Sequence, residues 1–136
     1  MTLTTVLLIA LTLIVLAVFV VQWMFRIMMM RMLRAGAKVA IEKAWTRMHQ
    51  NPNPTLKIVE ADKILDEALR LLGYQGSLGE KLKKAGPRFS NINDVWRAHK
   101  LRNTLVHQLD VKPNDREVDR AISSFHKALT DLGAKI

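Results

Sequence analysis

Apolar side chains occupy the first 25 positions of the chain almost without a break. Residues 3–25 include no Asp, Glu, Lys, Arg or His, and only threonines and Gln22 interrupt the apolar run. A helix of this length rises about 1.5 Å per residue and measures about 34 Å, enough to cross a hydrocarbon core of about 30 Å. A threonine hydroxyl in such a helix can bond to a carbonyl oxygen of its own chain. The pattern therefore predicts one transmembrane helix over residues 1–25.

A secretory signal peptide and a buried core helix are the alternatives for this apolar run. A signal peptide has a basic start, a shorter apolar stretch and a cleavage site made of small residues. Here the start is neutral, the run is long, and the bulky sequence WMFRIMMM follows at 23–30. A core helix needs partner surface, and a chain of 136 residues offers too little to hide so long an uncharged helix. A membrane anchor fits best.

After Arg26 the apolar positions recur at steps of three and four, the spacing of an amphipathic helix. Residues 26–50 carry this stripe, which consists of Ile27, Met30, Leu33, Ala37, Ile41, Ala44 and Met48. The segment is predicted to be a juxtamembrane helix. It either continues the anchor or, because Gly36 weakens the helix, forms a separate one. The prolines of NPNP at 51–54 end it.

Four further helical patterns follow, over residues 55–72, 77–85, about 90–109 and 114–132, and no strand pattern accompanies them. Ser77 with Glu80 forms a capping box, while Gly73 and Gly133 are placed to end helices. Short connections favour antiparallel neighbours, so residues 51–136 are predicted to form a small helical bundle in an all-α protein. Its core is small, which favours self-association or packing against the 26–50 helix.

Basic residues gather directly behind the apolar run. Residues 26–50 carry +5 of the chain's net charge of +9, because six Lys or Arg residues stand against Glu42 alone. Cations behind a membrane span mark its cytoplasmic side, and tryptophan marks the interface. The predicted membrane-flanking residues are Trp23, Arg26, Arg31 and Arg34. We therefore expect a single-pass protein of the cell membrane, with its N-terminus outside, its C-terminal domain in the cytoplasm, and anionic lipid headgroups as partners.

Several common chemistries lack the residues they require. There is no cysteine, which excludes disulfides, thiolate metal sites and cysteine catalysis. The four histidines lack zinc-ligand spacing, and neither a Gly-rich phosphate loop nor a GxSxG pattern is present. No metal site and no cofactor is expected.

The helix predicted over 90–109 places polar residues on or beside its apolar face, which Ala98, Leu101, Leu105 and Leu109 define. The residues so placed are Trp96, His99, Arg102, Asn103 and His107. Burying charged and polar groups is costly unless they are paired. The helix therefore indicates either a functional site or a paired structural network.

The segment Arg102-Asn103-Thr-Leu-Val-His107 resembles the R-N-x-x-x-H motif of the HEPN superfamily of prokaryotic helical-bundle proteins. The resemblance is specific over residues 96–109 and extends over 55–132 only as helix order. It implies a helical module that binds RNA or protein, or a metal-independent endoribonuclease with a composite site at a homodimer interface. Other family members keep the fold without activity. The chain also resembles small bacterial membrane-anchored proteins that carry no assigned activity.

In such a ribonuclease the 2′-hydroxyl of the RNA is the nucleophile, so no metal is needed. The resemblance implies that His107 is general acid or base, that Arg102 holds the phosphate, and that Asn103 orients one of them. Trp96 and His99 would belong to the binding surface. The cations expected to guide the RNA backbone are Lys81, Lys83, Lys84, Arg88, Arg97 and Lys100.

A structural role explains the same residues. Asp62 borders the buried face of helix 55–72 and would neutralise Arg102 inside the bundle, with His99 and His107 capping the network. The lysines would then be solvated or would lie on anionic lipid. Three functions stay open. The leading hypothesis is an interaction module for protein or RNA at the cytoplasmic face. The others are a membrane-held ribonuclease and a structural protein whose basic 26–50 helix binds anionic lipid.

Overall fold

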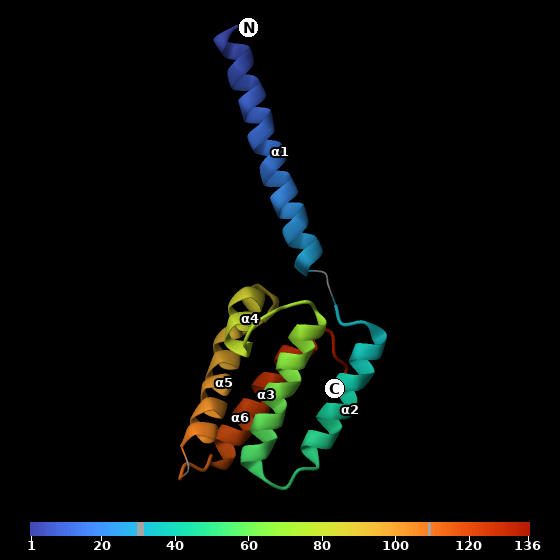
Figure 1. Ribbon diagram of the computed structural model, residues 1–136, viewed down its shortest axis with the longest axis vertical. Helices are drawn as coiled ribbons and strands as arrows, with labels where there is room; N and C mark the ends of the chain where they lie inside the picture. The colour runs from blue at the N-terminus through green and yellow to red at the C-terminus, as the bar shows by residue number, and fades with distance from the viewer. Residues whose placement is uncertain (30–31, 109) are drawn as a thin grey trace. The chain divides into compact units, whose positions relative to one another are not determined.

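The chain folds into helices, as the sequence predicts. The computed structural model describes residues 1–29, 32–108 and 110–136, and no strand occurs in these ranges (Figure 1). The elements are α1 (Leu3–Met29), α2 (Ala35–His49), α3 (Pro54–Leu71), α4 (Leu78–Ala85), the short 3-10 helix η1 (Gly86–Arg88), α5 (Ile92–His107) and α6 (Asp115–Asp131). They divide into two compact units, Met1–Arg31 and Met32–Ile136. The all-α prediction is confirmed.

The first unit is the apolar helix α1, and its segment Leu3–Ile27 is long and apolar enough to span a membrane. The side chains of Leu3–Ile27 are exposed, including Trp23, which is 60% exposed. The hydroxyl of Thr12 donates to the carbonyl of Ile9 at 2.8 Å, so this polar group is satisfied within the helix. Arg26 lies in the last turn of α1. Arg31, the next predicted flanking residue, lies outside the described residues.

Residues 26–50 do not form one helix, because α1 ends at Met29 and α2 begins at Ala35. Between them Leu33 is buried, and its amide donates to the carbonyl of Leu132 at 3.4 Å. In α2, the residues Ile41, Trp45 and Met48 are buried in the core of the second unit. The sequence placed the start of the bundle domain after residue 50, whereas the second compact unit begins at Met32. The apolar stripe of α2 covers α3, as the small predicted core requires.

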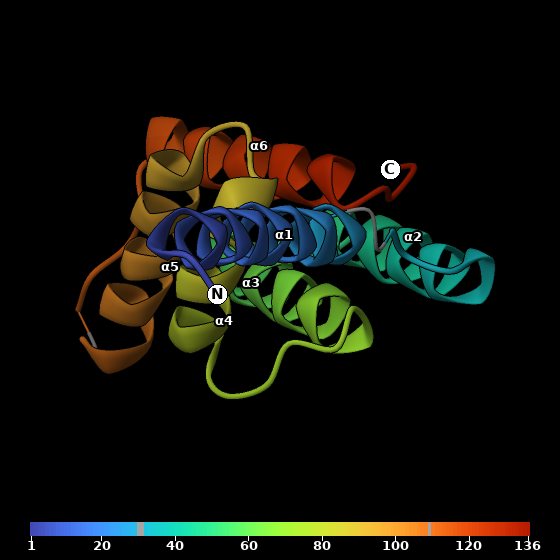
Figure 2. The same cartoon turned by 90° about the horizontal axis from the view of Figure 1, so that it is seen from above.

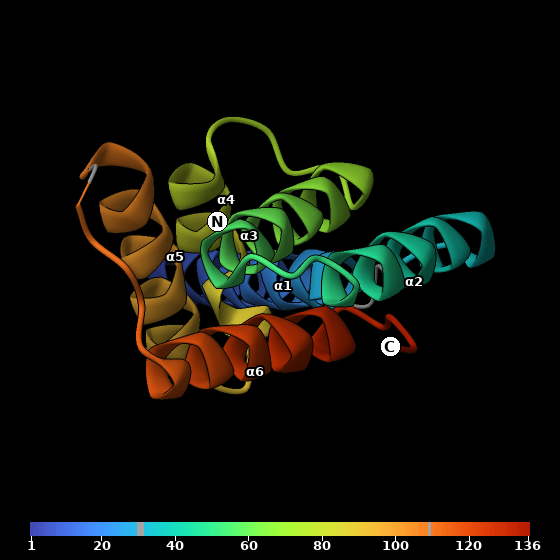
Figure 3. The same ribbon diagram turned by 90° about the horizontal axis from the view of Figure 1, so that it is seen from below.

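The second unit is a bundle with α3 at its centre. This helix contacts α2, α4, α5 and α6. Figures 2 and 3, from opposite ends, place α3 between α2 and α5, with α6 along one side. Chain direction alternates from α2 to α3 and from α5 to α6, so the antiparallel prediction holds (Figure 1). The largest fully buried side chains are Phe125, Met48, Ile58, Leu65, Leu69, Leu82, Leu129 and Leu132.

Local capping interactions set most helix boundaries. Ser77 and Glu80 form the predicted capping box of α4, and Asn114 with Glu117 forms a second one on α6. The hydrogen bond from the Ser77 amide lowers the pKa of Glu80 below its ordinary value, and the Ser77 side chain adds to this effect. The stabilisation is present above the ordinary pKa and is lost as pH falls through the lowered one. Gly73 and Gly133 follow the ends of α3 and α6 with φ of 93° and 94°, conformations that side chains rarely adopt.

Candidate functional site

The polar residues predicted from the sequence meet between α3 and α5, around the carboxylate of Asp62. This side chain is 5% exposed. One of its oxygens, Oδ1, lies 2.7 Å from Nδ1 of His99, and the other, Oδ2, lies 3.3 Å from Nε of Arg102. Both partners come from α5, four and seven residues after Val95, a buried residue of that helix. The expected pairing of Asp62 with Arg102 is confirmed.

Asn103 closes these contacts into a ring. Its side-chain oxygen accepts from the Arg102 guanidinium at 3.0 Å, and its amide nitrogen lies 3.4 Å from Nε2 of His99. A carboxylate only accepts hydrogen bonds, so His99 donates from Nδ1 to Asp62 and its Nε2 accepts from Asn103. Each member then has a polar partner, and Arg102 is held to Asp62 by charge, because its buried Nε makes an ion pair and not a hydrogen bond with the carboxylate. We call Asp62, His99, Arg102 and Asn103 the polar ring.

The polar ring is largely withdrawn from solvent. The side chain of His99 is 12% exposed and that of Arg102 is 24% exposed. The charge of Arg102 is offset by Asp62, and both nitrogens of His99 are engaged. This arrangement joins α3 to α5 and gives a physical account of why these polar residues lie in a helix face that packs inward.

The other residues predicted for the site lie around the ring or away from it. Trp96 is half-buried, packs edge-on to His99 with ring centroids 6.0 Å apart, and lies against Gly79 of α4. His107 is exposed in the last turn of α5 and forms no hydrogen bond or ion pair with the ring in the part of the chain described. His99, not His107, therefore occupies the place beside Arg102 and Asn103. Leu109, where the predicted helix was expected to end, lies outside the described residues.

The predicted cationic surface is divided by the fold. Lys81 is buried, and its ammonium lies 2.9 Å from Oδ1 of Asp66, so it is not a surface charge. It shares the inner face of α4 with Leu78, Leu82 and Ala85, a spacing visible in the sequence. The remaining cations are Lys83 and Lys84, exposed on α4, Arg97 and Lys100, exposed on α5, and Arg88, half-buried in η1.

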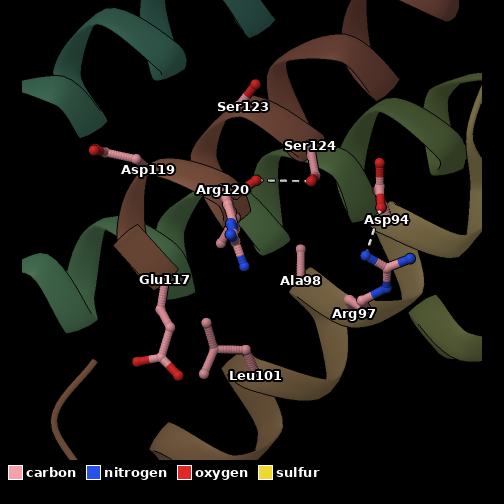
Figure 4. A pocket seen from close by; sticks show the side chains of 10 residues that line it. Asp94, Arg97, Ala98, Leu101, Glu117, Asp119, Arg120, Ser123 and Ser124 are labelled. Carbon is pink, nitrogen blue, oxygen red and sulfur yellow. Dashed lines mark hydrogen bonds and ion pairs between the residues drawn. The ribbon is translucent and has the colours of Figure 1, made fainter. Parts of the chain in front are cut away.

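A groove of about 680 Å³ between α5 and α6 was not predicted (Figure 4). Ala98 and Ala121 form part of its lining, and because their side chains are small they do not fill the space between the two helices. Its charged residues are Asp94 and Arg97, joined at 3.0 Å, together with Glu117, Asp119 and Arg120. The hydroxyl of Ser124 donates to the carbonyl of Arg120 at 2.7 Å, so its proton is directed to the backbone of its own helix. The groove combines apolar side chains with charges of both signs.

No group of three or more metal-ligating side chains occurs among the residues that the structure describes. Comparisons with protein-family models, with curated proteins and with solved structures gave no match. The fold and the local geometry therefore carry the functional argument.

Proposed function

We propose that this protein is a membrane-anchored helical module, similar to HEPN domains, which binds a protein or RNA partner at the cytoplasmic face. In this proposal α1 spans the membrane with its N-terminus outside. The bundle of residues 32–136 is held at the inner surface. The polar ring stabilises the bundle, and the exposed surfaces of α5 and α6 bind the partner.

The observation that carries the proposal is the exposed apolar surface of α1. No residue of the span Leu3–Ile27 is buried within the protein. An uncovered apolar helix of this length is unfavourable in water. It is stable in lipid, because its side chains contact hydrocarbon and its backbone groups form hydrogen bonds within the helix. The cations that follow the span favour a cytoplasmic location for the bundle.

The groove between α5 and α6 supports the binding part of the proposal. Arg97, an exposed residue of α5, lines it. Its lining has the acidic residues Asp94, Glu117 and Asp119 beside two arginines. An RNA surface would favour cations alone. Protein is therefore the partner that the groove favours.

The absence of cysteine allows a direct test of orientation. Two single-cysteine variants of the full chain, Thr2→Cys and Lys135→Cys, place a thiol on either side of the span at exposed positions. A membrane-impermeant maleimide should label position 2 in intact cells stripped of outer barriers, and should label position 135 only after lysis. The reverse pattern would contradict the orientation, and labelling of both positions before lysis would contradict a membrane-spanning α1.

A metal-independent endoribonuclease is a second candidate, favoured by the exposure of His107 on the same helix as Arg102. If it is correct, the full chain in detergent micelles will cleave RNA in the presence of a chelator. His107→Ala should then reduce the rate by roughly 10²–10⁴, the usual contribution of an acid or base. Because His107 is exposed, this variant should unfold like the parent.

His49→Ala is the matched control for this test, since His49 is also an exposed histidine near the end of a helix. It should leave the rate unchanged. Equal cleavage by the parent and by His107→Ala would exclude the motif-based reaction. The absence of any cleavage would leave the interaction module as the function to pursue.

A further inference from the structure

Charge is distributed unevenly along the bundle. One half holds the start of α2, the end of α3, α4, η1, the start of α5 and the end of α6, which lie at one end of the bundle in Figure 1. This near half, residues 32–41, 63–99 and 123–136, has eleven Lys or Arg and five Asp or Glu, a net charge of +6. The far half, residues 42–62 and 100–122, has eight Lys or Arg and seven Asp or Glu, a net charge of +1.

The five acidic residues of the near half are already engaged, so none of them is left to compensate the exposed cations Arg34, Lys83 and Lys84. Asp66 pairs with Lys81, Glu67 with Arg70, and Asp94 with Arg97. Glu80 accepts from the Ser77 amide, and Asp131 accepts from Ser90. The hydrogen bonds from Arg70 lower the pKa of Glu67 below its ordinary value, so this pair stays formed at neutral pH. Among the described residues the exposed cations Arg34, Lys83 and Lys84 form no ion pair.

Chain length ties this half of the bundle to the end of α1. Leu33 is fixed in the bundle by burial and by its hydrogen bond to Leu132. Only four steps of chain separate it from Met29, the last residue of α1, and these span at most about 14 Å. The negative potential of an anionic membrane reaches about 8–10 Å into solution at physiological salt. A bundle tethered so closely therefore has its near half within or beside that potential.

Apolar side chains are exposed in the same half. Met32 is 51% exposed in the segment before α2, and Leu71 is 42% exposed at the end of α3. Tyr74, half-buried, follows in the loop to α4. Surfaces that lie at the level of the lipid headgroups typically combine cations with exposed apolar and aromatic side chains.

We infer that the near half of the bundle is a docking surface for anionic phospholipid, with Arg34, Lys83 and Lys84 as its principal cations. The inference rests on the proposed membrane anchor and adds the lipid class and the face that binds it. Docking leaves the far half, with its nearly balanced charge, directed away from the membrane and open to a partner. It differs from lipid binding by α2 alone, because α4 supplies two of the three cations.

The test uses the full chain in vesicles of phosphatidylcholine with or without phosphatidylglycerol. A fluorophore on Leu71→Cys reports on the near half, and one on Val111→Cys, which is also exposed, reports on the far half. A lipid with a quencher on its headgroup should quench position 71 more strongly in anionic vesicles, and high salt should reverse the difference. Quenching of the fluorophore at position 111 should depend on neither lipid charge nor salt.

Charge variants of matched size separate the surface from the overall charge. Lys83→Gln with Lys84→Gln should lower the ratio of docked to undocked bundle by roughly 25-fold, because each cation near an anionic surface contributes about fivefold. Lys112→Gln with Arg116→Gln removes the same charge from exposed positions of the far half and should change nothing. Equal quenching at positions 71 and 111, or equal effects of the two double variants, would overturn the inference.

Two outcomes distinguish this inference from the anchor and from RNA binding. A protein that fails to float with either kind of vesicle contradicts the membrane anchor itself. If the protein floats with both kinds of vesicle but quenching at position 71 does not depend on phosphatidylglycerol, only the docking surface is contradicted. If a single-stranded RNA oligonucleotide binds the detergent-solubilised protein through Lys83 and Lys84 while lipid charge has no effect, the surface is an RNA site instead.

Discussion

Asp62→Ala is expected to lower the free energy of unfolding of the bundle by about 3 kcal/mol or more. The substitution removes the hydrogen-bond acceptor of His99 and the counter-charge of Arg102, whose side chains are 12% and 24% exposed. Loss of one member of a buried ion pair costs about 3–5 kcal/mol. For a domain of this size the melting temperature should fall by roughly 10–20 °C. Unfolding of the full chain in detergent is followed by Trp45 and Trp96 fluorescence, with Trp23→Phe removing the signal of α1.

Asp119→Ala is the matched control for this prediction. It removes the same side chain from an exposed position of α6, and its effect should stay within about 0.5 kcal/mol. Asp62→Leu combined with Arg102→Met removes both charges together and should be less destabilising than the sum of the two single changes. If Asp62→Ala melted like the parent, the polar ring would not contribute to the stability of the bundle.

Three arginines in the middle of α1 should remove the protein from the membrane. Leu11→Arg, Ile14→Arg and Val18→Arg together cost about 9 kcal/mol, since each arginine near the centre of a span costs about 2.5–3.5 kcal/mol. This cost is about as large as the favourable free energy of membrane insertion that about 20 apolar residues supply at about 0.3–0.6 kcal/mol each. The fraction of protein that stays in the membrane pellet after alkaline extraction should therefore fall by more than about tenfold.

The same three positions changed to alanine provide the control for α1. Alanine keeps the helix uncharged, so the protein should remain in the pellet. A parent chain that stayed in the supernatant after high-speed centrifugation without detergent, with its N-terminus intact, would contradict the membrane anchor. It would also remove the basis for the orientation and for lipid docking.

The R-N-x-x-x-H pattern illustrates how far a sequence pattern leads in this protein. The pattern includes two members of the polar ring, Arg102 and Asn103. It paired them with His107, whereas the ring contains His99, which lies one helical turn before Asn103. Both histidines lie near the same edge of α5, and what separates them is the position of Asp62 on α3. No spacing within α5 contains that information.

Local interactions explain why the sequence by itself determined α1 and most helix boundaries. The apolar run of residues 3–25, the capping box of Ser77 with Glu80, and the glycines after α3 and α6 act within a few residues of chain. Each can therefore be recognised from neighbouring letters. The pairing of Asp62 with Arg102 was also accessible, because an arginine on an inward face requires a counter-charge.

Only the tertiary structure decided which residues meet and which face solvent. Asp62 and His99 are 37 positions apart, and their contact depends on how α3 packs against α5. Packing also turned Lys81 inward to Asp66 while Lys83 and Lys84 stayed outside, included α2 in the bundle, and opened the groove between α5 and α6. These features arise from the fit of side chains between helices, which depends on the whole set of apolar surfaces and not on any one segment.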